Sequence, residues 1–358
     1  MKKFSMYLFT FCLVLAVTLC GCGGGGGGKK DAGPSSGALS NCTYVGPGVT
    51  ATIIGNALTL NIDTDDEDAS VLKVTFQKET GSDYENVYQT DTFWEGNKYL
   101  KFVIVDRVAM VIQPYKTDGS LLNNAFMLFC QKTYNQSEYI NKTYNHFVID
   151  PNYKDIRFGC MKIDTDFKGE GVNWEADPNW GPSNWGPSSP NNATFIYGTT
   201  VGVLGMKVTE DGGDILHHIF LPQSSTSSYQ SIYNGTYLLY MSHAEDEDKD
   251  GEDDKFIFEM TLENGKCTVT SLVDVNNEFN RTVVPFVGLT SETNAANIRA
   301  FRDAIQNALG TGGNGTFVFN NDGFLSIDPT GKFMVATSYD PNGNKYRSYA
   351  FGIKVVKK

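Results

Sequence analysis

The chain has 358 residues, of which 41% are hydrophobic and 13% aromatic, and it carries a net charge of −12. This composition supplies enough apolar side chains for two or three packed domains. The net negative charge argues against a protein that binds the phosphates of nucleic acid, because such proteins need clustered lysine and arginine. It also argues against direct adsorption onto anionic lipid.

The N-terminal segment has the pattern of an export signal. Lys2 and Lys3 precede an uncharged run from Phe4 to Leu19. This run of about 16 residues has the length of a signal-peptide apolar region and is short for a membrane span of roughly 20 residues. We therefore predict that residues 1–21 are a signal peptide that is removed from the mature chain.

The sequence Leu19-Cys20-Gly21-Cys22 resembles the lipobox of bacterial lipoproteins, with leucine three residues before the cysteine and a small residue directly before it. The resemblance implies that Cys22 is lipidated and becomes the new N-terminus, with acyl chains that give stable membrane attachment. Cys20 fits less well, because Leu19 would then occupy the small-residue position. The alternatives are an ordinary secretory signal and a retained transmembrane anchor. Gly23 follows where aspartate would retain a lipoprotein in the inner membrane. In a Gram-negative host the resemblance therefore implies the outer membrane. It is compatible with both the periplasmic and the surface face of that membrane.

Residues 22–40 are rich in glycine and serine and include six consecutive glycines. A flexible chain of this length has a root-mean-square reach of roughly 25 Å. We interpret it as a tether that keeps a folded body near the membrane surface without fixing it there.

Four cysteines follow the tether, at Cys42, Cys130, Cys160 and Cys267. An even number in an exported protein predicts two disulfides, and four cysteines allow three pairings. We favour Cys42 with Cys130, because they bracket one strand-rich segment, which leaves Cys160 with Cys267. The segment 41–358 contains no C-x-x-C, which argues against a redox or zinc-ribbon role.

Strand patterns dominate the body in chain order. Residues 49–63 form two β-rich runs around Gly55-Asn56, a dipeptide typical of a hairpin turn. Similar runs follow at 70–79, 97–115, 125–132, 194–208, 236–242, 255–273, 316–328 and 332–356. Turn residues recur about every 8–12 residues, which predicts an all-β fold of tandem β-sandwich or β-barrel units.

A motif of asparagine, any residue, threonine and an aromatic residue recurs in the body, at Asn41, Asn141, Asn192, Asn234 and Asn314. Asparagine suits a turn, and threonine and the aromatic residue suit the first positions of a strand. A tyrosine version precedes a phenylalanine version twice. This order predicts a duplicated β unit at 139–225 and 232–358, behind an N-terminal β domain at 41–132.

One helix is predicted, over residues 293–309, where Ile298, Phe301, Ile305 and Leu309 recur at helical spacing and Gly310 supplies a C-terminal cap. We expect this helix to close the end of a barrel or cover a sheet. The alternative is a helix that binds a partner.

The acidic segment 245–254 resembles the start of a calcium-binding loop. Asp246, Asp248 and Asp250 alternate and are followed by glycine, which allows carboxylates to converge on a hard cation. Asp253 is a further candidate ligand. The twelfth position holds isoleucine instead of glutamate, so the segment is not a complete EF-hand. We expect a Ca²⁺ loop at a hairpin tip instead. The alternatives are a solvated acidic loop and a patch that docks a partner.

The segment 173–192 holds Trp174, Trp180 and Trp185 and repeats Asn-Trp-Gly-Pro-Ser directly. Its proline and glycine content predicts a long loop, and such loops are often functional. Exposed tryptophan is favoured at binding sites, so a glycan or an envelope protein is the expected partner. The alternative is that these rings fold back over a barrel mouth or a sheet face.

Residues associated with catalysis form no recognisable motif. The chain contains neither G-x-S-x-G nor S-x-x-K, and the many carboxylates make any pair of them uninformative. His217 and His218 are adjacent in a predicted strand and should point to opposite faces, which argues against a shared metal. Three hypotheses follow. The first is a membrane-anchored envelope lipoprotein with a non-catalytic binding role, the second a glycan hydrolase of the envelope, and the third a structural component of a surface assembly.

Overall fold

The computed structural model describes fourteen stretches of the chain: residues 39–62, 70–93, 98–122, 124–149, 156–163, 169–171, 193–209, 215–222, 231–243, 254–263, 266–274, 284–287, 323–338 and 349–358. They belong to one compact unit, Ala38–Lys358. Within these stretches the structure is almost entirely β, and the only helical turns are η1 (Gln136–Glu138) and η4 (Ser231–Tyr233). None of the helices in this part of the chain is long and apolar enough to cross a membrane. The helix expected at 293–309 lies outside the described residues.

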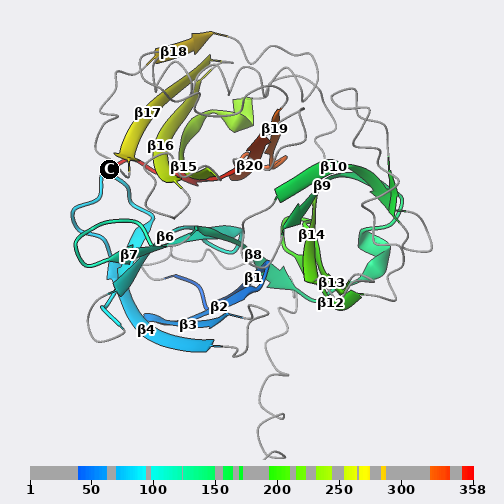
Figure 1. The fold of residues 1–358 in the computed structure, drawn as a ribbon, viewed down its shortest axis with the longest axis horizontal. Coiled ribbons are helices and arrows are strands. Elements are labelled where there is room, and N and C mark those ends of the chain that lie inside the picture. Colours follow the sequence, from blue (N-terminus) through cyan, green and yellow to red (C-terminus); the bar gives the residue numbers. More distant parts are fainter. Residues whose placement is uncertain are drawn as a thin grey trace, which may run out of the picture. The chain divides into compact units, whose positions relative to one another are not determined.

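The first eight strands form a closed antiparallel barrel (Figure 1, blue to cyan). Each strand pairs with the next along the chain, and β8 pairs back with β1 through Tyr44↔Cys130 and Val45↔Phe129. The strands are β1 (Cys42–Gly46), β2 (Val49–Ile54), β3 (Ala57–Ile62), β4 (Ser70–Lys78), β5 (Val87–Thr90), β6 (Lys98–Val105), β7 (Ala109–Lys116) and β8 (Phe126–Lys132).

Local sequence explains how the barrel strands form. Gly55 adopts φ +59° in the turn between β2 and β3, a conformation that glycine reaches without a steric penalty. On either side of this turn, buried and less buried residues alternate, so that Ile53 and Leu58 pair across the hairpin and point into the core. The predicted Gly55-Asn56 hairpin is therefore confirmed.

The structure contains a disulfide between Cys42 at the start of β1 and Cys130 in β8, with Cα atoms 6.7 Å apart. This is the pairing that the sequence favours. It joins the first and last strands of the barrel beside their own hydrogen-bonded register. Cys160 lies in β10 and Cys267 in β17, but their side chains lie outside the described residues, so their pairing stays a prediction.

A second group of strands extends from the barrel (Figure 1, green). Its order is β12-β13-β14-β9-β10-β11, and the end of β8 pairs with β12 through Lys132↔Gly198 and Gln131↔Thr199. The strands are β9 (Lys142–Ile149), β10 (Ile156–Ile163), β11 (Gly169–Gly171), β12 (Ala193–Thr199), β13 (Leu204–Thr209) and β14 (Ile215–Pro222).

A third group forms a separate seven-stranded sheet in the order β18-β17-β16-β15-β21-β20-β19 (Figure 1, yellow to red). The strands are β15 (Gly235–His243), β16 (Asp254–Glu263), β17 (Lys266–Asp274), β18 (Val284–Val287), β19 (Gly323–Ile327), β20 (Phe333–Ser338) and β21 (Tyr349–Val355). Every pair of neighbouring strands in this sheet is antiparallel.

The asparagine–threonine–tyrosine motif opens the first strand of each group. Its tyrosines Tyr44, Tyr144 and Tyr237 are all buried. The Tyr144 hydroxyl donates to the Tyr139 carbonyl at 2.9 Å, and the Tyr237 hydroxyl donates to the Tyr233 carbonyl at the same distance. In each group the first strand also pairs with the last, as β1 with β8, β9 with β14, and β15 with β21. The motif therefore marks the start of the first strand in each group, as its residue types suggest.

The three groups share one apolar core. One cluster of buried side chains runs from Phe129 in β8 through Phe147 and Ile219 in the second group to Phe333 and Phe351 in the third. Because burial of apolar area is the main favourable term in folding, this continuity makes the groups parts of one packed body. The predicted domain boundaries and the duplication stay predictions.

Candidate functional site

Cys22, the predicted calcium ligands and the three tryptophans lie outside the described residues, but described strands flank the calcium and tryptophan segments. Asp246, Asp248, Asp250 and Asp253 connect β15 to β16, whose ends pair as His243↔Asp254. The segment with Trp174, Trp180 and Trp185 connects β11 to β12, the two outer strands in the order of the second group. In the described stretches no three His, Cys, Asp or Glu side chains gather into a set that could hold a metal. Calcium at 246–253 therefore stays a prediction, and so does lipidation of Cys22.

The barrel interior is filled by side chains. Phe76, Tyr88 and Phe102 meet at its centre, with ring centroids 5.1 to 5.7 Å apart. Tyr88 and Phe102 stack within 13° of parallel, and Phe76 packs edge-on against both. Eight-stranded barrels either fill with side chains in this way or keep room for one small ligand. In the described strands of this barrel, the interior side chains pack against one another.

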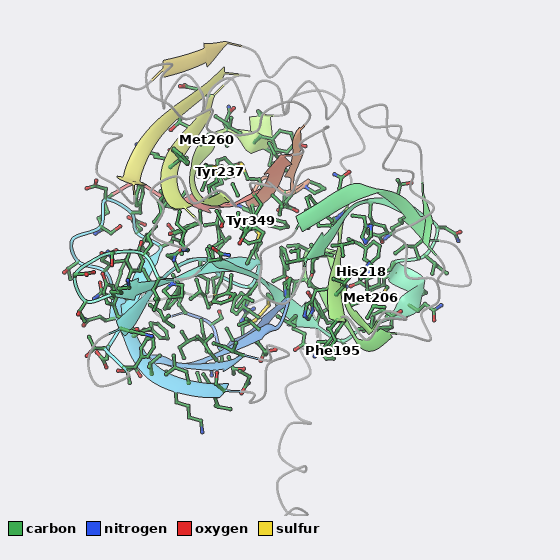
Figure 2. The ribbon with its side chains drawn as sticks, in the orientation of Figure 1. Phe195, Met206, His218, Tyr237, Met260 and Tyr349 are labelled. Carbon is green, nitrogen blue, oxygen red and sulfur yellow. A yellow bond between two sulfur atoms is a disulfide. The ribbon has the colours of Figure 1, made fainter. Side chains whose placement is uncertain are left out.

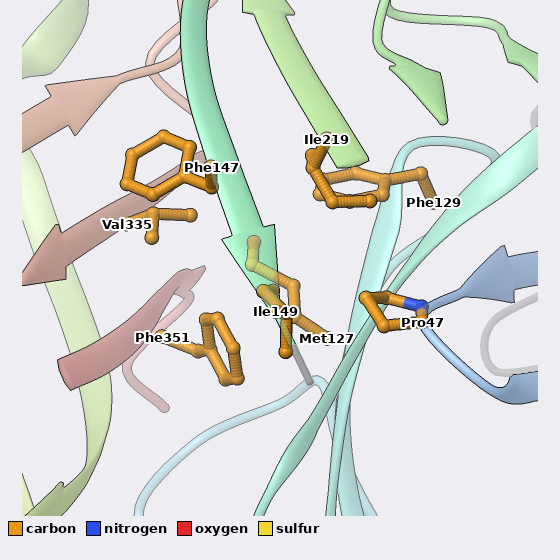
Figure 3. A pocket seen from close by; sticks show the side chains of 8 residues that line it. All are labelled: Pro47, Met127, Phe129, Phe147, Ile149, Ile219, Val335 and Phe351. Carbon is orange, nitrogen blue, oxygen red and sulfur yellow. The ribbon is translucent and has the colours of Figure 1, made fainter. Parts of the chain in front are cut away.

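A small cavity lies where the three groups meet (Figure 3). Its walls include Met127 and Phe129 of β8, Ile149 and Ile219 of the second group, and Val335 and Phe351 of the third. The cavity measures about 10 Å³, near the minimum for one water molecule, and its walls are apolar. It is a packing void at a junction and is too small for an organic ligand.

A polar seam, formed by Tyr84, Asn86, Glu259, Lys354 and Lys357, joins the barrel to the third sheet. The Asn86 amide donates to the carbonyls of Ile104 and Lys354, both at 3.0 Å. The Tyr84 hydroxyl donates to Glu259 Oε2 at 2.5 Å, and Glu259 Oε1 pairs with Lys357 Nζ at 2.9 Å. Burial and the adjacent Glu259 carboxylate raise the pKa of Tyr84, so its hydroxyl stays protonated and keeps donating.

Titratable side chains come together inside the second group, where His146 of β9 and His218 of β14 are buried. Figure 2 labels His218 among the strands of this group. His146 Nε2 and His218 Nδ1 are 3.0 Å apart, so one imidazole donates a hydrogen bond to the other. The rings stack with centroids 5.1 Å apart, and His146 also stacks on Phe220 at 4.5 Å. Burial, followed by the neighbouring His217, lowers the pKa of His218 to about 4. Burial, followed by His218, holds the pKa of His146 well below its usual range.

Solved structures of transferrin binding protein B are similar to this chain at a low level. A variant of the vaccine antigen from Haemophilus parasuis Hp5 is 9% identical with a TM-score of 0.21, and the match covers 86% of this chain and 66% of that one. The isotype 1 protein from serogroup B Neisseria meningitidis is 12% identical with a TM-score of 0.22, over 86% of this chain and 64% of that one. The chain thus spans slightly less than two thirds of these structures.

No family model matches the sequence. No curated protein matches it either. At TM-scores near 0.2, the structural likeness carries no argument about this chain, so its function is argued from its own residues.

The histidine pair is the feature that sequence reasoning missed. His217 and His218 do point to opposite faces of β14, because they pair with Ile149 and Val148 in successive positions. The partner of His218 is His146 of β9, which is 72 residues away in the sequence. His146 stands opposite Phe220 of β14. Only the register between β9 and β14 brings these imidazoles together, and no local pattern encodes that register.

Proposed function

We propose that this protein is a lipid-anchored component of the bacterial cell envelope whose β-rich body has a non-catalytic binding role. The observation that carries the proposal is the order of features along the chain, from the lipobox-like sequence ending at Cys22, through the glycine-rich segment, to a body whose first strand begins at Cys42. An acyl anchor on Cys22 would offset the repulsion between an acidic body and an anionic membrane surface.

The first residues of the body support this arrangement. Ser40 donates through its hydroxyl to Asp106 Oδ2 at 2.7 Å, and its N–H donates to Asp106 Oδ1 at 3.3 Å. Two residues later, Cys42 forms the disulfide with Cys130. Disulfides persist in oxidising compartments outside the cytosol, which agrees with an exported body. The chain therefore becomes firmly held within a few residues of the end of the proposed tether.

The filled barrel supports a binding role that lies on connecting segments, since binding residues are often carried by loops on a rigid scaffold. We place this role on the segment with Trp174, Trp180 and Trp185, with an envelope glycan or protein as partner. We assign Ca²⁺ to Asp246, Asp248, Asp250 and Asp253, where the ion would order a loop. The outer membrane is the proposed location.

The anchor is tested by replacing Cys22 with serine. Cys22→Ser should block acylation and move the protein from the membrane fraction to the soluble fraction, because one covalent site carries both acyl chains. Cys20→Ser is the matched control and should stay in the membrane fraction. The measurement is cell fractionation with metabolic labelling by radioactive palmitate. Equal labelling of the Cys22→Ser and wild-type proteins would overturn the anchor assignment.

The binding role is tested on the Trp180→Ala/Trp185→Ala variant by chemical cross-linking in intact cells. The wild-type protein should give a discrete cross-linked product that is reduced at least tenfold in the variant, since truncation of a tryptophan at a binding site costs about 2 kcal/mol or more. Trp94→Ala, which removes the fourth tryptophan, should leave the product unchanged. Loss of the product in all variants, or in none, would contradict the assignment.

A further inference from the structure

The histidine pair lies between two central strands of the second group. His146 in β9 stands opposite Phe220, and His218 in β14 stands opposite Val148, so the two imidazoles are diagonal neighbours on one face. Only 2% of His146 and 3% of His218 is exposed. The hydrogen bond between them therefore forms without competition from bulk water.

No described residue that faces the pair carries a negative charge. The described side chains on the same face include Tyr144 of β9, Phe220 of β14 and Met206 of β13, and all three are uncharged. The Tyr144 hydroxyl donates to the Tyr139 carbonyl, and burial raises its pKa. Among the described residues, His218 Nε2 has no hydrogen-bond partner.

Among the described strands, the ionisable residues at neighbouring register positions, other than tyrosine, are basic. His217 occupies the opposite face of β14 and pairs with Lys207 of β13, and Arg157 holds the β10 position that pairs with Val148. Burial and neighbouring histidines, with no carboxylate of the described residues, lower the pKa values of the two imidazoles. A proton added to the pair would therefore create a buried charge without a counter-ion, which is strongly unfavourable.

We propose that His146 and His218 make the second group of strands an acid-sensitive element, in which β9 and β14 separate on acidification while the barrel stays closed. This inference goes beyond the proposed binding role and does not depend on it. It implies that the molecule has two conformations in an envelope exposed to the pH of its surroundings.

The direction of the pH effect follows from proton linkage. In the separated state both histidines are solvated and should titrate near their ordinary pKa of about 6.5. In the folded state their pKa values are lower, so the separated state binds more protons. The contact between β9 and β14 is then fully present above about pH 6.5 and weakens as the pH falls toward 4. For each proton bound, the ratio of closed to open molecules falls by up to about tenfold per pH unit.

The test is hydrogen exchange measured by mass spectrometry between pH 7 and pH 4.5, corrected for the intrinsic pH dependence of exchange. Protection of peptides covering 142–149 and 215–222 should fall about tenfold or more per pH unit below 6.5. Peptides covering 98–116 in the barrel should keep constant protection. In His146→Phe/His218→Leu the pH dependence should disappear. His217→Gln, on the opposite face, should retain it.

A second measurement on the wild-type protein decides the matter if the double variant does not fold. NMR titration of the histidine side chains should give two imidazoles that stay neutral down to about pH 5. Constant protection of β9 and β14 across the pH range would overturn the proposal. Titration of both imidazoles near pH 6.5 in the folded protein would overturn it equally.

Discussion

Removing the disulfide between Cys42 and Cys130 should lower the free energy of unfolding by about 4–5 kcal/mol, because the cross-link spans 88 residues and restricts the unfolded chain. The loss should be large for a second reason. The disulfide joins β1 to β8, the pairing of first and last strands that closes the barrel. Urea denaturation of Cys42→Ala, Cys130→Ala and the double variant measures the effect.

The three variants control one another. Because either single replacement removes the cross-link, each should lose nearly the full amount, and the double variant should lose no more than about 1 kcal/mol beyond the larger single value. Additive losses would mean that each cysteine acts through its own packing. A loss below about 1 kcal/mol in the double variant would show that the cross-link does not stabilise the barrel.

Phe129→Ala should cost about 3–5 kcal/mol of unfolding free energy, the range for deleting a buried aromatic ring from a core. Phe129 is 2% exposed and packs against Phe333 with ring centroids 5.1 Å apart. It also lines the cavity where the three groups meet, so its removal would enlarge an existing void that the surrounding strands cannot close. The loss should therefore reach the upper part of the range.

The matched control is Ile54→Ala, because Ile54 is 62% exposed and should change stability by less than about 0.5 kcal/mol. Urea unfolding, followed by circular dichroism in the near and the far ultraviolet, should show one shared transition in the wild-type protein. The account fails if Phe129→Ala matches the control, or if the wild-type probes report separate transitions for separate sheets.

Short-range patterns predict the strands well. The period-two alternation and the Gly55-Asn56 turn locate β2 and β3, and the runs at 97–115 and 125–132 match β6, β7 and β8 within a few residues. These elements depend on residues that are neighbours in sequence, so local propensity and turn chemistry suffice to find them. The sequence only favours the Cys42–Cys130 pairing among three possible pairings, because the two cysteines bracket one strand-rich segment, and the structure contains it.

Long-range pairings are not predictable in this way. The closure of β1 on β8, the joining of β8 to β12 and the contact between β9 and β14 depend on which strands pair, and alternation is the same for every pairing. The histidine pair shows the consequence, because His146 and His218 are unremarkable until the register places them 3.0 Å apart. The shared core is likewise a property of three groups that the sequence suggests as separate units.

The most direct test of lipid anchoring is mass spectrometry of the N-terminal peptide from protein isolated from membranes. We expect a peptide that begins at Cys22, carries a diacylglyceryl group on the cysteine sulfur and continues into the glycine run. A peptide that begins at Met1, or an unmodified N-terminus downstream of Cys22, would contradict the anchored arrangement on which the proposed function rests.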